Sequence, residues 1–135
     1  DIAVLLVELE APSTILHLRV AAEPTALADV RRSLARWLLD LKVEGRLRDD
    51  VLTAAGEAIA NSVEHAYGPK GGWIDVMFSL ERETLTIVVR DGGHWRNRSS
   101  GRGKGTTLMR ALMDSVQYEK SDRGTTVTMY RRLPS

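Results

Sequence analysis

Two alternating runs in the middle of the chain place the strongest limit on its fold. Over residues 73–80 and 84–90, apolar side chains occupy every second position, which is the pattern of strands that bury one face. The polar link 81–83 is short enough to make the two runs an antiparallel hairpin. A sheet with one apolar face is completed by a second layer that covers that face.

Helical periodicity supplies the covering layer. A helix is expected after Pro24, capped at Thr25, and a second from about Arg48 to the Gly68-Pro69 break. A third is expected over residues 106–113, and the remaining strands over 13–20, 116–120 and 125–133. The sequence therefore predicts an α+β fold, a two-layer α/β sandwich with a mixed, mainly antiparallel sheet and helices on one face.

The second helix carries polar residues opposite its apolar stripe. The stripe recurs at spacings of three and four and consists of Leu52, Ala55, Ile59, Val63 and Ala66. Glu57 and Asn61 lie one turn apart on the other side. An amide oxygen is a hard ligand that suits Mg²⁺, and a carboxylate one turn away can take a proton. An ordinary solvent-facing helix surface would show the same pattern, so both interpretations stay open.

The second strand of the hairpin ends in Asp91-Gly92-Gly93. A carboxylate at this point can accept a hydrogen bond from the exocyclic amine of adenine, where guanine has a carbonyl. The adjacent glycine lets the backbone approach a flat base without a Cβ in between. Asp-Gly is also a common turn pair, so a simple strand-end turn is the alternative.

A glycine-rich segment precedes the third helix. Residues 101–105 read Gly-Arg-Gly-Lys-Gly, and glycine-rich backbone leading into a helix N-terminus favours anions. Arg98, Arg102 and Lys104 add positive charge nearby. The pattern lacks the spacing of a Walker-type P-loop. A flexible glycine loop without a ligand is the alternative.

Together these segments resemble a known family. In order and spacing, residues 57–68, 91–93, 101–105 and the strand start at 124–126 resemble the N, G1, G2 and last-strand motifs of the GHKL ATPases, which share the Bergerat fold. The most similar members are the bacterial anti-sigma-factor serine kinases, and the resemblance runs from about Ser13 to Leu133. The sequence departs from the family pattern at Trp95, where a second G1 glycine is expected, and at Lys104 and Thr106.

The resemblance implies a function and a set of roles. It implies an ATP-dependent serine/threonine protein kinase that sequesters a sigma factor and phosphorylates a serine on an anti-anti-sigma (STAS-type) partner. Asn61 would ligate Mg²⁺, Glu57 would act as the base, and Asp91 would bind adenine. Gly93 and Thr125 would support the base. The residues implied for the phosphates are Arg98, Gly101, Arg102, Gly103, Lys104 and Gly105.

Two other functions stay open. The domain could capture a sigma or anti-anti-sigma partner with weak or no ATP turnover, as the departures at Trp95, Lys104 and Thr106 suggest. It could also be an α+β domain that binds no nucleotide. Retention of Glu57 and Asn61 favours the kinase, since a pure binding module needs neither residue.

Residues 1–10 read differently from the rest. The apolar run 2–7 predicts a buried strand. It resembles the tail strand of the metal-dependent phosphatases of sigma-factor regulation, with Asp1 at the position of their metal-binding aspartate. The alternative is an edge strand of the same domain. We expect the ATP-binding domain over residues 11–135.

Composition excludes several other classes. The formal net charge is +1, which offers no general attraction to nucleic acid or an anionic membrane. No apolar run approaches the roughly 20 residues of a membrane helix. The chain has no cysteine, which excludes disulfides and thiol chemistry and fits a cytoplasmic location. Because the family often dimerises, a homodimer is a further expectation of the resemblance.

Overall fold

A computed structural model describes residues 14–66, 72–92, 102–121 and 124–134, although not the side chains of 65–66 and 102–106. Residues 1–10, with their expected strand, lie outside the described part. The elements are, in chain order, β1 (Ile15–Ala21), α2 (Ala26–Asp40), α3 (Gly45–Ala66), β2 (Trp73–Glu81), β3 (Thr84–Asp91), α4 (Arg102–Leu112), β4 (Ser115–Ser121) and β5 (Gly124–Arg132).

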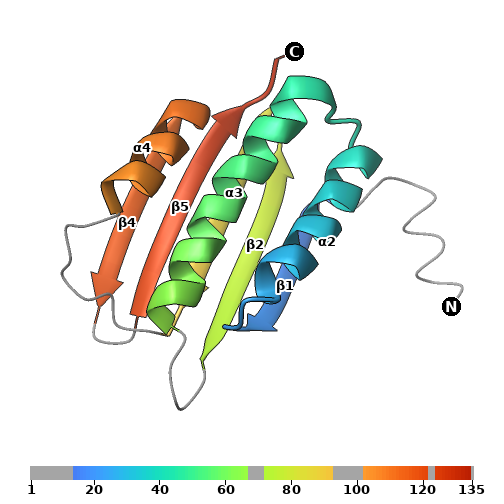
Figure 1. Ribbon diagram of the computed structural model, residues 1–135. Helices are drawn as coiled ribbons and strands as arrows, with labels where there is room; N and C mark the ends of the chain where they lie inside the picture. The colour runs from blue at the N-terminus through green and yellow to red at the C-terminus, as the bar shows by residue number, and fades with distance from the viewer. Residues whose placement is uncertain (1–13, 67–71, 93–101, 122–123, 135) are drawn as a thin grey trace, which may run out of the picture.

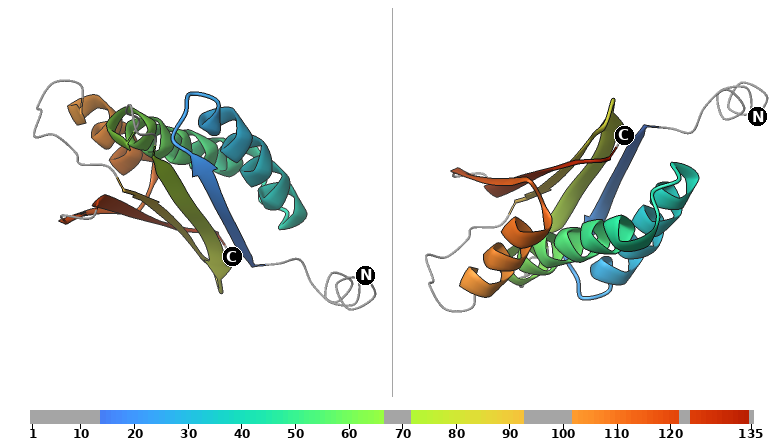
Figure 2. Two further views of the ribbon diagram at one scale, coloured as in Figure 1. Left: turned by 90° about the horizontal axis from the view of Figure 1, so that it is seen from below. Right: turned by 90° about the horizontal axis from the view of Figure 1, so that it is seen from above.

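The strands form one five-stranded sheet in the order β1-β2-β3-β5-β4. All four pairings of these strands are antiparallel, including the predicted β2–β3 hairpin. Figure 1 shows the three described helices lying across one face of the sheet. The edge-on views show that no described helix covers the other face (Figure 2). The α+β two-layer prediction is confirmed.

The core lies between this sheet face and the helices. The alternation predicts the inward positions of β2 and β3, and most of them are fully buried: Ile74, Val76, Phe78, Leu85, Ile87 and Val89. Leu80, the last predicted inward position of β2, is only partly buried. Trp37 of α2 packs against Phe78 with 6.1 Å between ring centroids. Trp37 is therefore part of the core.

The helix starts differ from those predicted. Thr25 precedes α2 as expected, but its side chain makes no capping hydrogen bond. Helix α3 begins at Gly45 rather than Arg48, and Gly45 has a left-handed φ of 66°. Helix α4 begins at Arg102 rather than near Thr106. Gly103 and Gly105 lie in the first turn of α4, and a glycine inside a helix costs about 1 kcal/mol relative to alanine. The packing of α4 on α3 offsets this cost.

Arg131 of β5 joins the helical layer to the sheet. Its Nη1 atom donates to Asp50 Oδ2 at 3.5 Å, near the start of α3, and to the Leu112 carbonyl at the end of α4. Arg131 also stands opposite Leu85 of β3. The start of α3 therefore lies near the β2–β3 turn, and α3 runs from there toward the opposite end of the sheet (Figure 1). The register places Asp91 at that end, opposite Ile74 of β2.

Candidate functional site

The C-terminal half of α3 presents polar residues in two directions. Glu57 and Asn61 are half-buried at the side of the helix, while Glu64 is exposed. The fully buried face passes through Val51, Ala55 and Ala58 to Ser62. Glu57 and Asn61 thus stand at the boundary between core and solvent, where a ligand can reach them. The prediction had placed them roughly opposite the core.

Asp91 and Thr125 lie side by side at one end of the sheet. They are directly opposed residues on the paired strands β3 and β5, and both are buried, with 1% and 2% of their surface exposed. The resemblance assigned both to the same adenine-binding role although 33 positions separate them in the chain. The tertiary structure brings the two together. At such buried positions, carboxylate and hydroxyl oxygens can recognise the polar atoms of a ligand through directional hydrogen bonds.

Gly124 permits this close approach of the two strands. Its φ is 145°, and a Cβ built on it would lie 1.9 Å from the Asp91 carbonyl oxygen. No side chain fits at such a distance, and few residues other than glycine adopt this φ. The glycine that precedes Thr125 is therefore a requirement of the geometry around Asp91.

Trp73 covers the backbone next to Asp91. A Cβ on Gly92 would meet the indole at 3.2–3.3 Å, so the glycine lets the ring approach. The Arg19 guanidinium lies 4.3 Å from the centre of the Trp73 ring, a cation–π distance. We expected Gly92 and Gly93 to admit a flat base; Gly92 accommodates the Trp73 indole, and Gly93 lies outside the described residues.

The predicted phosphate-binding segment is described only in part. Gly93, Trp95, Arg98 and Gly101 lie outside the described residues. Residues 102–105 belong to the first turn of α4, so Gly103 and Gly105 contribute helical backbone rather than a loop. Helix α4 packs against α3, the helix that carries Asn61. The free N–H groups of its first turn are the part of a helix that favours anions.

The described residues include no group of three or more His, Asp or Glu side chains placed to hold a metal ion. Mg²⁺ in nucleotide sites is usually held by one or two protein ligands together with phosphates and waters. The Asn61 amide suits such a role. The donor set is therefore compatible with a metal that arrives with the nucleotide.

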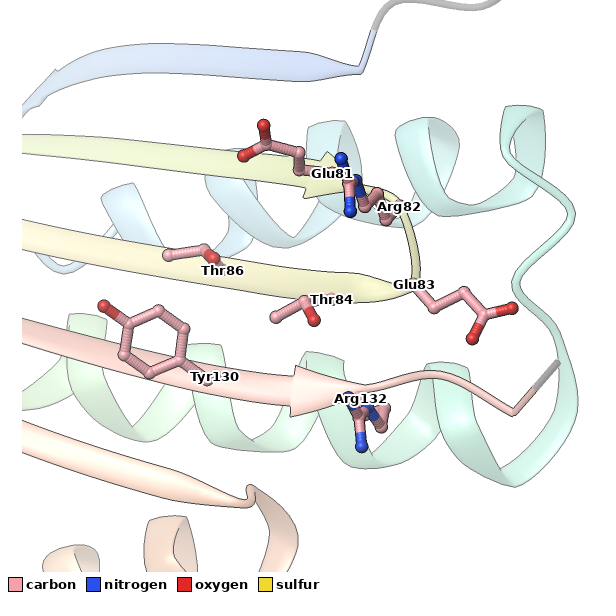
Figure 3. A pocket seen from close by; sticks show the side chains of 7 residues that line it. All are labelled: Glu81, Arg82, Glu83, Thr84, Thr86, Tyr130 and Arg132. Atoms are coloured by element: carbon pink, nitrogen blue, oxygen red, sulfur yellow. The ribbon is translucent and has the colours of Figure 1, made fainter.

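An open hollow of about 790 Å³ lies elsewhere, at the β2–β3 turn (Figure 3). It is lined by Glu81, Arg82, Glu83, Thr84, Thr86, Tyr130 and Arg132. The register places it at the opposite end of β3 from Asp91. The hollow is therefore distinct from the predicted nucleotide site, because it lies at the other end of the sheet and its lining carries both acidic and basic side chains.

Sequence reasoning missed one buried polar residue. Ser62 is fully buried, and together with Asp91 and Thr125 it makes up the buried polar set of the described residues. The signal was present in the periodicity, since Ser62 follows Ala58 by four positions and Ala55 by seven.

A known family matches most of the chain. The histidine kinase-like ATPase domain family matches residues 20–131. The chain belongs to this family, which confirms the predicted GHKL-type fold. Within it, the matches confirm the predicted similarity to anti-sigma-factor serine kinases, as the individual relatives show.

Two curated relatives carry informative names. The chain is 28% identical to the serine-protein kinase RsbW of Bacillus velezensis, over 87% of this chain and 85% of that protein. It is 30% identical to the anti-sigma F factor of Clostridium acetobutylicum, over 63% of this chain and 70% of that protein. Both names match the predicted class.

Solved structures give the same picture. A structure of the RsbU and RsbW domains of Rv1364c from Mycobacterium tuberculosis matches with a TM-score of 0.75 and 26% identity, over 90% of this chain. Our chain spans 32% of that longer chain. A blue-light-activated histidine kinase domain from Erythrobacter litoralis matches with a TM-score of 0.56 and 16% identity, over 79% of this chain and 59% of that chain, which supports the fold alone.

None of the described helices is both long enough and apolar enough to cross a bilayer.

Proposed function

We propose that this domain is an ATP-dependent serine kinase that also acts as an anti-sigma factor. The observation that carries the proposal is the buried pair of Asp91 and Thr125, held together by Gly124 at the end of the sheet toward which α3 carries Glu57 and Asn61. Membership of an ATPase-domain family supports nucleotide binding. The names of the relatives support the kinase and anti-sigma activities.

The proposed roles follow from the chemistry of each side chain. The Asp91 carboxylate accepts a hydrogen bond from the adenine amine, with Thr125 and Gly93 beside it. The Asn61 amide oxygen ligates Mg²⁺, which offsets phosphate charge when bound. Glu57 accepts the proton of the attacking serine hydroxyl. The residues proposed to contact the phosphates are Arg98, Gly101, Arg102, Gly103, Lys104 and Gly105.

The partners belong to the same proposal. A sigma factor would be sequestered, in line with the relative named anti-sigma F factor. The kinase substrate would be a serine on an anti-anti-sigma domain of STAS type; the relative named serine-protein kinase RsbW supports the serine kinase activity alone. The similar Mycobacterium tuberculosis chain contains an RsbU and an RsbW domain. Residues 1–10 would be either the tail strand of an upstream phosphatase domain or an edge strand of this domain.

Equilibrium binding of ATP and ADP, with and without Mg²⁺, tests the nucleotide site. We expect Mg²⁺-dependent binding to the wild type and its loss in Asn61→Ala. Glu64→Ala is the matched control, because Glu64 is exposed on the same helix and should leave binding unchanged. Absence of binding to the wild type at millimolar nucleotide would contradict the kinase function and leave partner capture as the function of the domain.

Phosphotransfer to a purified STAS-type domain distinguishes the proposed role of Glu57 as the general base from a role in nucleotide binding. Glu57→Gln keeps the size of the side chain and removes its ability to take a proton. We expect this variant to bind Mg²⁺-ATP like the wild type and to transfer phosphate roughly 10²–10⁴-fold more slowly. Equal transfer rates would remove Glu57 from the mechanism.

A further inference from the structure

The last described residues of β3 face opposite sides of the sheet. Asp91 continues the buried side of the strand that includes Val89, so Gly92 faces the side that no described helix covers, the open face (Figure 2). The described glycines with a positive φ are Gly45 and Gly124. The backbone conformation of Gly92 therefore gives no reason for a glycine at this position.

Trp73 supplies the reason. The register that pairs Ile74 with Asp91 brings Trp73 beside Gly92 on the open face. A Cβ added to Gly92 would lie 3.2 Å from the indole Nε1 and 3.3 Å from Cε2 and Cζ2, closer than an ordinary contact between carbon atoms of about 3.5–4.0 Å. The indole therefore lies against the Gly92 backbone, as an aromatic ring does when it covers a glycine on a neighbouring strand.

Arg19 of the adjacent strand β1 holds the indole in this place. Its guanidinium lies 4.3 Å from the centre of the Trp73 ring, and such a contact at an exposed site stabilises by about 0.5–1 kcal/mol. Asp75 stands directly opposite Arg19, but its Oδ1 atom is bonded to His17 Nε2 at 2.8 Å. Contacts within the open face thus fix the position of the ring.

The backbone of Asp91 and Gly92 is also contacted from the other neighbouring strand. A Cβ added to Gly124 of β5 would lie 1.9 Å from the Asp91 carbonyl oxygen and 3.0 Å from the Gly92 Cα atom. Because β3 lies between β2 and β5 in the sheet, this short piece of backbone is enclosed by Trp73 on one side and Gly124 on the other. A shift of either neighbour moves Asp91.

We propose that Trp73 is a positioning residue for the nucleotide site. The indole, held by Arg19, supports the Gly92 backbone and thereby fixes the direction of the Asp91 carboxylate. The inference rests on the proposed ATP site. Hydrogen bonds weaken steeply when donor and acceptor are misaligned, so a small movement of Asp91 lowers the affinity for ATP. The affinity for the nucleotide is therefore coupled to contacts made on the open face, away from the nucleotide itself.

The test measures the Kd of Mg²⁺-ATP and the rate of phosphotransfer at saturating ATP. We expect Trp73→Ala to raise the Kd about 3- to 10-fold, the effect of weakening one hydrogen bond. The rate at saturating ATP should stay unchanged, because Glu57 and Asn61 lie on α3 and not on β2. Trp73→Phe keeps an aromatic ring and should restore most of the affinity. Tyr130→Ala is the matched control, because it removes an aromatic ring at the other end of the sheet, opposite Thr86.

Gly92→Ala tests whether Trp73 acts through Gly92. The added Cβ meets the indole at 3.2–3.3 Å, so this variant should also bind ATP more weakly than the wild type. Trp73→Ala removes the ring that the Cβ would meet, so the double variant should bind no more weakly than Trp73→Ala alone. Gly92→Ala adds one methyl group at an ordinary φ, and it keeps the proposal testable even if Trp73→Ala fails to fold.

Three results would overturn the proposal. A Kd equal to that of the wild type in Trp73→Ala or Gly92→Ala would do so, and a lower resistance to urea at unchanged Kd would assign Trp73 a structural role alone. Additive losses in the double variant would show that Trp73 does not act through Gly92. A wild type that binds no ATP defeats the proposed function and this inference with it, whereas a wild type that binds ATP no more tightly than the variants defeats this inference alone.

Discussion

At the residue scale, the site depends on positions where a side chain must be absent as much as on those where one is present. Asp91 and Thr125 supply polar atoms, but Gly124 makes their arrangement possible, because a Cβ there would overlap the Asp91 carbonyl. Gly92 plays the corresponding part for the Trp73 indole. Gly92 and Gly124 therefore serve close packing of the protein against itself.

Gly124→Ala should destabilise the domain by more than about 2 kcal/mol, because it combines an unfavourable φ with a backbone overlap at 1.9 Å. ATP binding should fall as well, since Asp91 must shift. Gly45→Ala is the matched control: its φ is 66° but no atom lies within 4 Å of the added Cβ, so only about 1–2 kcal/mol of strain is expected. Urea unfolding of both variants is the measurement. If Gly124→Ala and Gly45→Ala lose the same free energy of unfolding, the overlap with the Asp91 carbonyl is relieved without cost.

At the scale of elements, α3 has the central position in the fold. It packs against α2, α4, β2 and β3, and its C-terminal half carries Glu57, Asn61 and Ser62. Its placement relative to the sheet therefore sets the distance between the proposed catalytic and base-binding groups. Arg131 secures the opposite end of α3 and, through the Leu112 carbonyl, the end of α4.

Arg131→Met should loosen α4 while keeping most of the apolar stem of the side chain. Loss of the two partly buried contacts should cost about 1–3 kcal/mol, with faster amide hydrogen exchange in α4. Asp50→Asn is the control, because it removes the charge pair at 3.5 Å and leaves the bond to Leu112 in place. Its cost should stay below about 1 kcal/mol. If Arg131→Met and Asp50→Asn lose the same free energy of unfolding, the hydrogen bond to the Leu112 carbonyl contributes nothing measurable to stability.

At the scale of the whole molecule, the two-layer architecture gives the sheet one buried and one open face. Ile87 and Thr86 are neighbours on β3 that face opposite ways: Ile87 is fully buried and Thr86 lies on the open face, beside the hollow of Figure 3. Large apolar groups also reach the surface on this face, among them Met77 and Tyr130.

Ile87→Ala should therefore cost about 2–5 kcal/mol, as for other buried aliphatic truncations. Thr86→Ala, one position away, should change stability by no more than about 0.5 kcal/mol. Chemical denaturation at low protein concentration is the measurement. A large loss in Thr86→Ala would mean that the open face is covered in solution, which the two-layer arrangement does not predict.

The sequence alone determined the architecture and the family. Period-two alternation identified the inward residues of β2 and β3, and helical periodicity located the three helices, because burial imposes these repeats on any amphipathic element. The order of four short motifs identified the ATPase family that the comparisons confirm. Helix starts were less well predicted: α4 begins four residues early because packing against α3 outweighs the weak helix propensity of glycine.

Only the tertiary structure decided which distant residues meet. Nothing local in the sequence places Thr125 beside Asp91; the β3–β5 register does so. The burial of Ser62 also depends on the rotation of α3 against the sheet. The repeat of Ala55, Ala58 and Ser62 offers one apolar face and the stripe through Ile59 and Val63 an adjacent one, and packing in the folded protein selects between them. Register and helix rotation are set by long-range packing and the closeness that Gly124 allows, so the base-binding end of the site emerges only when the chain is folded.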